Sequence, residues 1–341
     1  MNPKDNLIKA IRLEKPERLP VTILSGGVWT FNNRGYTLKE LEGKSALIAE
    51  LIAETNEKVK SDVVWVGSGY NNLPVRAIGG KIKFRPKGAP DIEEPAISHP
   101  REIDQINLDR LAEDEGISGI WETAALLNQL VGDRVLVGAG GWGPFSLAAQ
   151  IYGVEKMMHG LYKDQAAVHA ILEFATEVSF RYYEGAIKAG AQIVSIGEPT
   201  SSGDMISRKH YEEFALPYQQ KFIRRAQEAG AYTLLHICGD ITNRLDLAKR
   251  TGADVLSVDY KVDLADVRAE AKGELAFAGN VNPVDILEVG TPEQVAAAVE
   301  DCLERAGTEG NFILMPGCDI PPGVPLENLE AFINTGLKYR Y

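Results

Sequence analysis

Cysteine, excess positive charge and long apolar runs are all scarce in this sequence of 341 residues. The three cysteines, Cys238, Cys302 and Cys318, are too few and too odd in number for a disulfide framework, so we expect reduced thiols. The net charge of -12, with scattered Lys and Arg, argues against nucleic acid or an anionic membrane surface as a partner. No run approaches the roughly 20 apolar residues of a membrane span, and the N-terminus lacks a signal-peptide pattern. We therefore expect a cytoplasmic protein.

The sequence is instead rich in short apolar runs that alternate with helical stretches. Eight such runs are predicted to be strands: Leu19–Leu24, Asp62–Val66, Arg134–Ala139, Gln192–Ile196, Tyr232–His236, Asp254–Val258, Leu275–Ala278 and Phe312–Met315. Most are apolar throughout, as is typical of parallel strands covered on both faces. A glycine precedes several of these runs at a similar position, which indicates repeated helix-to-strand loops: Gly190, Gly230, Gly252 and Gly273.

Eight strand–helix units predict an α/β protein with a (β/α)8 TIM barrel, formed by residues 1–341 as a single domain with additions at the N-terminus. A doubly wound open sheet is the alternative. The strand count favours the barrel, and no G-x-G-x-x-G motif follows any strand. Residues from about Pro74 to Arg110 fit the repeat poorly, and we interpret them as an insertion with a β-hairpin around Gly79-Gly80, placed over one mouth of the barrel.

Polar residues follow the C-terminal ends of the later predicted strands, where barrel enzymes carry their active sites. His236 and Cys238 alternate at the end of one strand and can project the same way, and a loop could bring Cys318 to them. Such a set suits zinc, with a fourth position left open as in catalytic sites. H-x-C is a short motif, so a structural role and a Cys238–Cys318 disulfide remain alternatives. Cys302, on a predicted helix Pro292–Ala306, is assigned to the core.

Other strand ends supply candidates for catalysis and substrate binding. Glu198 is predicted to be a catalytic acid or a displaceable fourth zinc ligand, and its alternative role is a helix N-cap or a surface carboxylate. Asp259 and Asn280 are weaker candidates for substrate binding, since Asn side chains also build turns. Trp29 and Trp142 represent the aromatic residues of the early loops, which suit either a substrate pocket or ordinary core packing.

Five segments carry a family pattern: Gly143–Ala148, Ile193–Thr200 with Ser202–Asp204, His236–Asp240, Gly279–Pro283 and Pro316–Pro322. They resemble the uroporphyrinogen decarboxylase superfamily, and more narrowly its methylcobamide:coenzyme M methyltransferase branch. The combination of H-x-C with P-G-C-D marks the branch, and the resemblance weakens only between about Trp29 and Arg101. It implies a (β/α)8 barrel, zinc on His236, Cys238 and Cys318, and a corrinoid protein as partner.

The sequence departs from the decarboxylases after its first predicted strand. Those enzymes have an Arg-rich loop there for a polycarboxylate substrate, whereas this chain has Leu24-Ser-Gly-Gly-Val-Trp-Thr30 without a cation. We therefore expect a zinc-dependent methyltransferase acting between a corrinoid and a small methyl donor or acceptor, either an aromatic methyl ether or a thiol such as coenzyme M. A decarboxylase and a non-catalytic zinc protein are the alternatives. No cobalamin-binding motif is found, so the corrinoid is expected on a separate protein.

Overall fold

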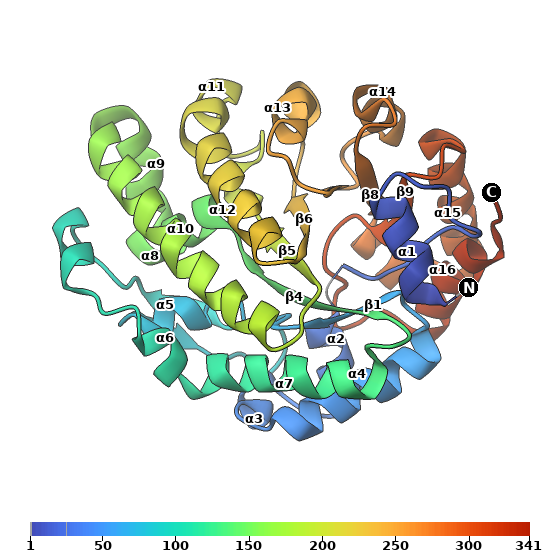
Figure 1. Cartoon of the computed structure of the whole chain (residues 1–341), viewed down its shortest axis with the longest axis horizontal. Coiled ribbons are helices and arrows are strands. Elements are labelled where there is room, and N and C mark those ends of the chain that lie inside the picture. The colour runs from blue at the N-terminus through green and yellow to red at the C-terminus, as the bar shows by residue number, and fades with distance from the viewer. Residues whose placement is uncertain (1, 25) are drawn as a thin grey trace.

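The computed structural model describes residues 2–24 and 26–341, and its central feature is one curled parallel sheet. The sheet order follows the chain: β1 (Val63–Val66), β4 (Leu136–Trp142), β5 (Ile193–Gly197), β6 (Tyr232–Ile237), β7 (Val255–Val258), β8 (Ala276–Val281) and β9 (Phe312–Pro316). A doubly wound sheet would reverse its order at a switch point, and this one does not. Figure 1 shows the strands at the centre with helices around them. The predicted barrel is confirmed.

The first predicted strand closes the barrel without forming a regular strand. Val21 makes a parallel bridge to Leu314 of β9, and the amide of Asp62, just before β1, donates to the carbonyl of Val21. Pro20 has no amide hydrogen, which limits ladder pairing along this segment. The prediction of a strand over Leu19–Leu24 was therefore wrong in its secondary structure, although the segment lies where an eighth strand would lie.

Helices cover the outside of the sheet, and a second set lies on the connecting loops. Gly190 and Gly230 adopt positive φ angles of 109° and 94° after two of the helices, as expected for C-terminal glycines. Cys302 is buried in α15, as predicted. The covering helices are α4 (Ser45–Val59), α7 (Glu115–Val131), α8 (Pro144–Tyr152), α10 (Gln165–Lys188), α12 (Leu216–Glu228), α13 (Leu245–Lys249), α14 (Leu264–Ala271), α15 (Pro292–Ala306) and α16 (Leu326–Lys338). The helices of the connecting loops are α2 (Gly27–Asn33), α3 (Leu38–Leu41), α5 (Leu73–Ala77), α6 (Arg110–Glu113), α9 (Val154–Lys163) and α11 (Arg208–His210).

The N-terminal end of the barrel is filled by α1 (Pro3–Ile11). Leu7, Ala10 and Ile11 join one buried cluster with the inward-facing side chains of the strands, such as Val63 and Leu136. The helix begins well because Pro3 lies in its first turn and the Asn2 side chain accepts a hydrogen bond from a backbone amide of that turn. This end of the barrel is therefore packed with apolar side chains.

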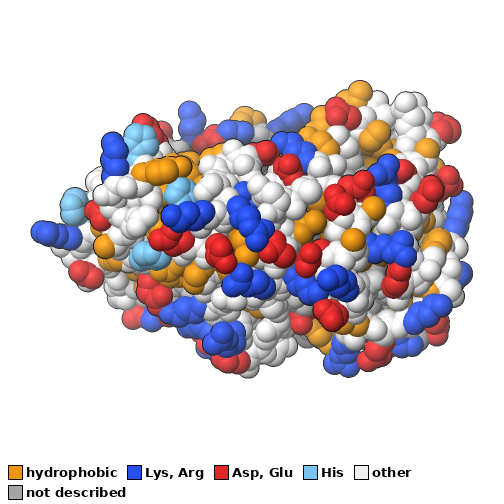
Figure 2. Space-filling view, turned by 90° about the horizontal axis from the view of Figure 1, so that it is seen from above, with side chains coloured by type: hydrophobic (Ala, Val, Ile, Leu, Met, Phe, Trp, Pro, Cys, Tyr) orange, Lys and Arg blue, Asp and Glu red, His pale blue; other side chains and the backbone are white. Residues whose placement is uncertain are grey.

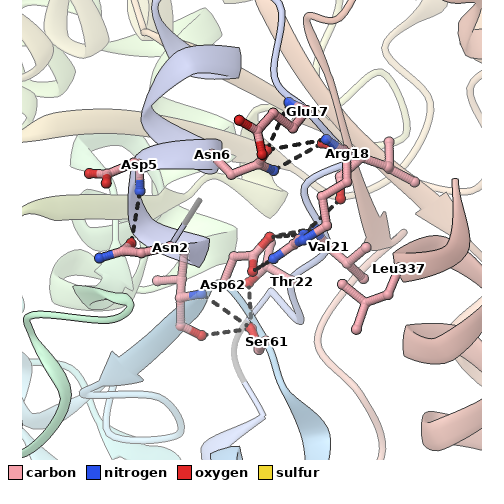
Figure 3. A network of polar contacts seen from close by, with 12 residues as sticks. Asn2, Asp5, Asn6, Glu17, Arg18, Val21, Thr22, Ser61, Asp62 and Leu337 are labelled. Carbon is pink, nitrogen blue, oxygen red and sulfur yellow. Dashed lines mark hydrogen bonds and ion pairs between the residues drawn. The ribbon is translucent and has the colours of Figure 1, made fainter. Parts of the chain in front are cut away.

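A network of hydrogen bonds, called the closure network, joins the segment around Val21 to the start of β1 (Figure 3). Its members are Arg18, Val21, Thr22, Ser61 and Asp62. Arg18 donates to both oxygens of Asp62, at 2.8 and 2.6 Å, and the amide of Val21 donates to the same carboxylate at 3.0 Å. The hydroxyls of Thr22 and Ser61 lie 2.9 Å apart. Asp62 is fully buried, so the bidentate pair and the amide together satisfy a charge that would otherwise be costly to bury.

The insertion does contain a hairpin, made of β2 (Lys81–Lys83) and β3 (Asp91–Glu94). Its connection spans residues 84–90, so the prediction of a turn at Gly79-Gly80 was wrong. Gly79 instead follows the end of α5 with a φ of +115°. Glycine adopts such a positive φ at a helix end as readily as in a hairpin turn. Ala89 of the connection lines a cavity at the C-terminal mouth, where the hairpin was expected to lie.

The described part of the chain contains no helix long and apolar enough to span a membrane. In Figure 2 the charged side chains of both signs are interspersed over the visible face, without a block of one sign. That mixture agrees with the scattered Lys and Arg of the sequence.

Candidate metal centre

Three side chains that could hold a metal ion meet at the C-terminal ends of β6 and β9. His236 lies near the end of β6, Cys238 directly follows that strand, and Cys318 follows β9. Their ligand atoms all lie within 4.8 Å of one another. His236 Nε2 is 3.1 Å from Cys238 Sγ, which is 3.4 Å from Cys318 Sγ. The barrel thus brings together the three residues that were predicted from the sequence to be metal ligands.

The geometry of this group fits zinc. Tetrahedral zinc, with bonds of about 2.3 Å to sulfur and about 2.0 Å to nitrogen, separates neighbouring ligand atoms by roughly 3.5 to 3.8 Å. The observed separations of 3.1 and 3.4 Å need only small movements to reach that arrangement. All three cysteines of the chain are free thiols, so the group is not a disulfide. Two thiols and an imidazole supply three of zinc's four usual positions.

Neighbouring polar groups orient the ligands. Ser257 Oγ on β7 lies 2.9 Å from His236 Nδ1, which leaves Nε2 facing the two thiols. The carboxylate of Asp259 accepts a hydrogen bond at 2.9 Å from the amide of Gly239, the residue after Cys238. Gly239 has a φ of +86°, where other residues are strained. Asp259 therefore holds the turn that carries Cys238.

The two thiols polarise each other. The hydrogen bond from Cys238 lowers the pKa of Cys318, and the nearby His236 lowers it further. The same bond between the sulfurs raises the pKa of Cys238, because that thiol keeps the proton they share. A cation at this position would displace the remaining proton, since the thiolate is the form that binds metal.

Glu198 follows β5 and is fully buried. Its carboxylate accepts hydrogen bonds from the amides of Phe145 and Ser146, at 3.1 and 2.7 Å, at the N-terminus of α8. Burial raises the pKa of Glu198 to about 7, although both amide bonds lower it. Its oxygens are outside the group of ligand atoms described above. The structure thus places Glu198 as a cap of α8, and its roles as acid or fourth ligand stay predictions.

A cavity of about 330 Å³ opens onto the metal centre. Among the described residues that line it there is no Lys or Arg, and its one carboxylate is that of Asp319. The lining consists of small, apolar and aromatic residues around the three candidate ligands: Leu24, Trp65, Asn71, Ala89, Gly140, Gly141, Trp142, Ser195, Gly197, Pro199, His236, Cys238, Cys318 and Asp319. Such a cavity suits a small, flat and uncharged molecule.

The residues predicted to bind substrate lie in different surroundings. Trp142 lines the cavity, but Trp29 is buried and donates from Nε1 to the carbonyl of Val324. The amide of Asn280 donates to two carbonyls of the loop after β7. Neither Trp29, Asn280 nor Asp259 is among the lining residues of the cavity.

Sequence reasoning missed Trp65, Asp319 and Asn72. Trp65 occupies an inward-facing position of β1, which strand periodicity could have revealed. Asn72 donates to the carbonyl of Pro90 in the hairpin and accepts a hydrogen bond from Trp142 Nε1 at 2.7 Å. Its partners are distant in the sequence, so no local signal marks this residue as a link between the hairpin and the cavity wall.

The family model for uroporphyrinogen decarboxylase (URO-D) matches residues 2–339, and the chain belongs to this family. A methylcobamide:CoM methyltransferase of Methanosarcina mazei is 30% identical over 350 residues, covering 99% of this chain and 98% of that protein. A uroporphyrinogen decarboxylase of Parasynechococcus marenigrum is 31% identical over 347 residues, covering 97% and 95%. The resemblance seen in the motifs is confirmed, but overall identity does not separate the two activities.

Solved structures support the same fold. A methyltransferase from Methanosarcina mazei matches with a TM-score of 0.89 at 26% identity, over 98% of both chains. A B12-independent methionine synthase from Shewanella sp. W3-18-1 matches with a TM-score of 0.58 at 13% identity, over 88% of both chains, and this likeness concerns the fold alone.

Proposed function

With membership of the uroporphyrinogen decarboxylase family as the premise, we propose that the whole chain is one methyltransferase domain. It moves a methyl group between a small substrate and a corrinoid carried by a separate protein, with zinc held by His236, Cys238 and Cys318. The observation that carries this proposal is that one imidazole and two thiols meet at the wall of a cavity. Among the described residues that line this cavity there is no Lys or Arg. Reduced thiols of this kind suit the cytoplasm predicted from the sequence.

The same cavity argues against decarboxylation of a porphyrinogen. A polycarboxylate needs Arg or Lys partners once water is removed, because unpaired buried charges are strongly unfavourable. The cavity instead presents a carboxylate, Asp319, which would repel such a substrate. A structural zinc protein is also disfavoured, since structural sites usually fill all four positions with protein ligands and this group offers three.

When bound, zinc would act as a Lewis acid on the oxygen or sulfur that carries or receives the methyl group. The chain's own residues do the positioning. Ser257 fixes the imidazole of His236 so that Nε2 faces the two thiols, and Asp259 fixes the turn of Cys238. Trp65 and Trp142 supply flat walls, and Ala89 of the hairpin connection lines the same cavity. We also propose that Glu198 is a catalytic acid or a displaceable ligand, because its raised pKa suits proton transfer near neutral pH.

The lining of the cavity favours an uncharged substrate. An aromatic methyl ether can stack on Trp65 or Trp142, whereas the sulfonate of coenzyme M would find no described cation there. We therefore propose an aromatic methyl ether as the methyl donor ahead of coenzyme M as the methyl acceptor. The relatives named for coenzyme M are similar over nearly the whole chain. We therefore propose that the lining residues of the cavity, rather than the shared fold, decide the small substrate.

The test combines metal analysis with an assay of methyl transfer. Purified protein should contain about one zinc per chain, in line with one three-ligand site. Methylation or demethylation of the corrinoid is followed by its absorption spectrum with the chain alone, with free cobalamin and with a corrinoid protein. We expect the chain alone to be inactive. Turnover of a substrate without any corrinoid would refute the proposal.

A further inference from the structure

Two glycines lie within the strands that form one wall of the cavity. The register of β4, β5 and β6 places Trp142, Gly197 and His236 in one row across the sheet. Gly140 lies two residues before Trp142 on β4, and side chains alternate along a strand, so this position faces the same way. Both Gly140 and Gly197 line the cavity. The row therefore has a residue without a side chain between an indole and a candidate metal ligand.

The backbone does not require glycine at either position. Neither Gly140 nor Gly197 has a positive φ, so residues with side chains can adopt both conformations. Glycine within a strand also weakens that strand, because it loses more backbone entropy on folding and packs no side chain. The reason for glycine at these two positions therefore lies in the space that a side chain would occupy.

Contacts within the protein do not require glycine either. A Cβ added to Gly140 would have one described atom within 4 Å beyond its chain neighbours, the carbonyl oxygen of Val66 at 3.9 Å. A Cβ added to Gly197 would lie 3.4 Å from Cε3 and Cζ3 of Trp142, which is an ordinary packing distance. Side chains at these positions would therefore enter the cavity without a clash inside the protein.

Gly138 of the same strand is a contrasting case. It lies two residues before Gly140 and faces the same way, but a Cβ there would lie 2.4 Å from Cε3 of Trp65. Gly138 thus makes room for an indole of the protein itself. The corresponding space at Gly140 belongs to the cavity, so a ligand is what it can accommodate.

The aromatic walls of this space favour a flat occupant. The indole of Trp142 is held in place, because its Nε1 donates to the side chain of Asn72 at 2.7 Å and its carbonyl accepts from the hydroxyl of Ser179 at 3.0 Å. Trp65 lines the same cavity, and no Lys or Arg is among its described lining residues. An uncharged aromatic ring can stack on such walls, and it needs the volume that side chains would otherwise fill.

We propose that Gly140 and Gly197 are specificity-determining residues that make room for the planar ring of the methyl donor. This inference rests on the proposed function and deepens it, because it names the two positions that limit the size of the substrate. Neighbouring strands lie about 4.8 Å apart, so a ring in front of Gly197 contacts Trp142 on one side and reaches the candidate ligand His236 on the other. The group that the ring carries then meets the metal centre.

The experiment measures how two kinds of ligand bind to Gly140→Ala and Gly197→Ala. The planar probes are anisole and guaiacol, and the small probe without a ring is β-mercaptoethanol. Calorimetric titration of the purified protein should show the planar probes binding at least about tenfold more weakly to each variant, since one surplus methyl group in a filled pocket has an effect of that order. The affinity for β-mercaptoethanol should change less than about twofold, because a small ligand leaves space for the added methyl group.

Zinc content and thermal melting of the same variants should match those of the wild type, since neither added methyl group meets a close contact. The matched control is Gly119→Ala in α7, where the added Cβ would lie 3.5 Å from its nearest atoms and away from the cavity. This control should bind all three probes as the wild type does. Gly140 and Gly197 lie on different strands, so each variant tests the proposal independently.

The outcomes separate this inference from the proposed function. A wild type that binds neither planar probe, or variants that bind them as well as the wild type does, would refute the role of the two glycines. Equal weakening of the planar and small probes would show general damage to the site and would also refute it. If the variants selectively lose the planar probes but the wild type transfers no methyl group with any corrinoid, the proposed function fails and the two glycines still limit the size of an aromatic ligand.

Discussion

At the N-terminal end of the barrel, the buried Asp62 accepts hydrogen bonds from Arg18 and from a backbone amide, whereas at the C-terminal end two thiols and an imidazole face one another beside a cavity. The first arrangement pairs its charges within the protein and is plugged by α1. The second brings together three ligand atoms that could bind one cation. This difference assigns stability to one end and chemistry to the other, the division that barrel enzymes generally show.

Removing a thiol should produce the largest effect at the C-terminal end. We expect Cys238→Ala and Cys318→Ala to reduce zinc from about one per chain to nearly none, because two remaining ligands hold the ion weakly. Methyl transfer should fall at least about 100-fold with the loss of the metal. Metal analysis and activity assays measure both quantities.

The control for the thiol variants is Cys302→Ala, which removes a buried thiol within α15. It should keep the zinc and lose only some stability. Zinc that survives Cys318→Ala but disappears with Cys302→Ala would show that the ligands are wrongly assigned.

Breaking the closure network should affect folding and leave the metal alone. Asp62→Asn leaves Arg18 without its buried partner, and we expect a loss of about 3 kcal/mol in the free energy of unfolding, measured with urea. Zinc content of the folded variant should be unchanged. The control is Glu57→Gln, since the exposed ion pair of Glu57 with Arg134 is worth no more than about 1 kcal/mol. Equal losses in the two variants would remove the energetic distinction between a buried and an exposed pair.

The sequence could predict the features that depend on local pattern. Parallel strands buried on both faces have an apolar signature, so β1 and β4 to β9 were found, and helical periodicity placed Cys302 in the core. The barrel rule then brought His236, Cys238 and Cys318 to one mouth, because the C-terminal ends of parallel strands meet there.

Features that depend on distant partners could not be predicted in this way. Trp29 turns toward the carbonyl of Val324, and Asn72 joins the hairpin to Trp142, across separations that leave no local trace in the sequence. Gly79 was read as a turn because glycine with a positive φ serves both turns and helix ends. The first strand was overpredicted because an apolar run does not reveal that its ladder is replaced by the closure network.

Glu198 combines features of both ends of the barrel. It lies at the C-terminal end with the candidate ligands, but its buried carboxylate is hydrogen-bonded within the protein, as that of Asp62 is. Its pKa of about 7 lies above the value of about 4.3 for an unfolded chain. Ionisation is therefore disfavoured by folding, and the stability contributed by this group is complete below about pH 4 and lost as the pH rises to about 7. In metal-free protein, Glu198→Gln should gain on the wild type by up to about 3 kcal/mol between about pH 5 and pH 8.

The same measurement on zinc-loaded protein separates the two proposed roles of Glu198. A metal ligand must be ionised, so zinc bound to this carboxylate would hold it charged at low pH and abolish the stability difference that grows between about pH 5 and pH 8. A catalytic acid that only caps α8 would keep that pH dependence with zinc present, and Glu198→Gln would then lower turnover about 100-fold while zinc content stays the same. Unchanged turnover together with a retained pH dependence would show that Glu198 is a structural cap of α8. Its role would then be stability, like that of Asp62, and not chemistry, like that of Cys238.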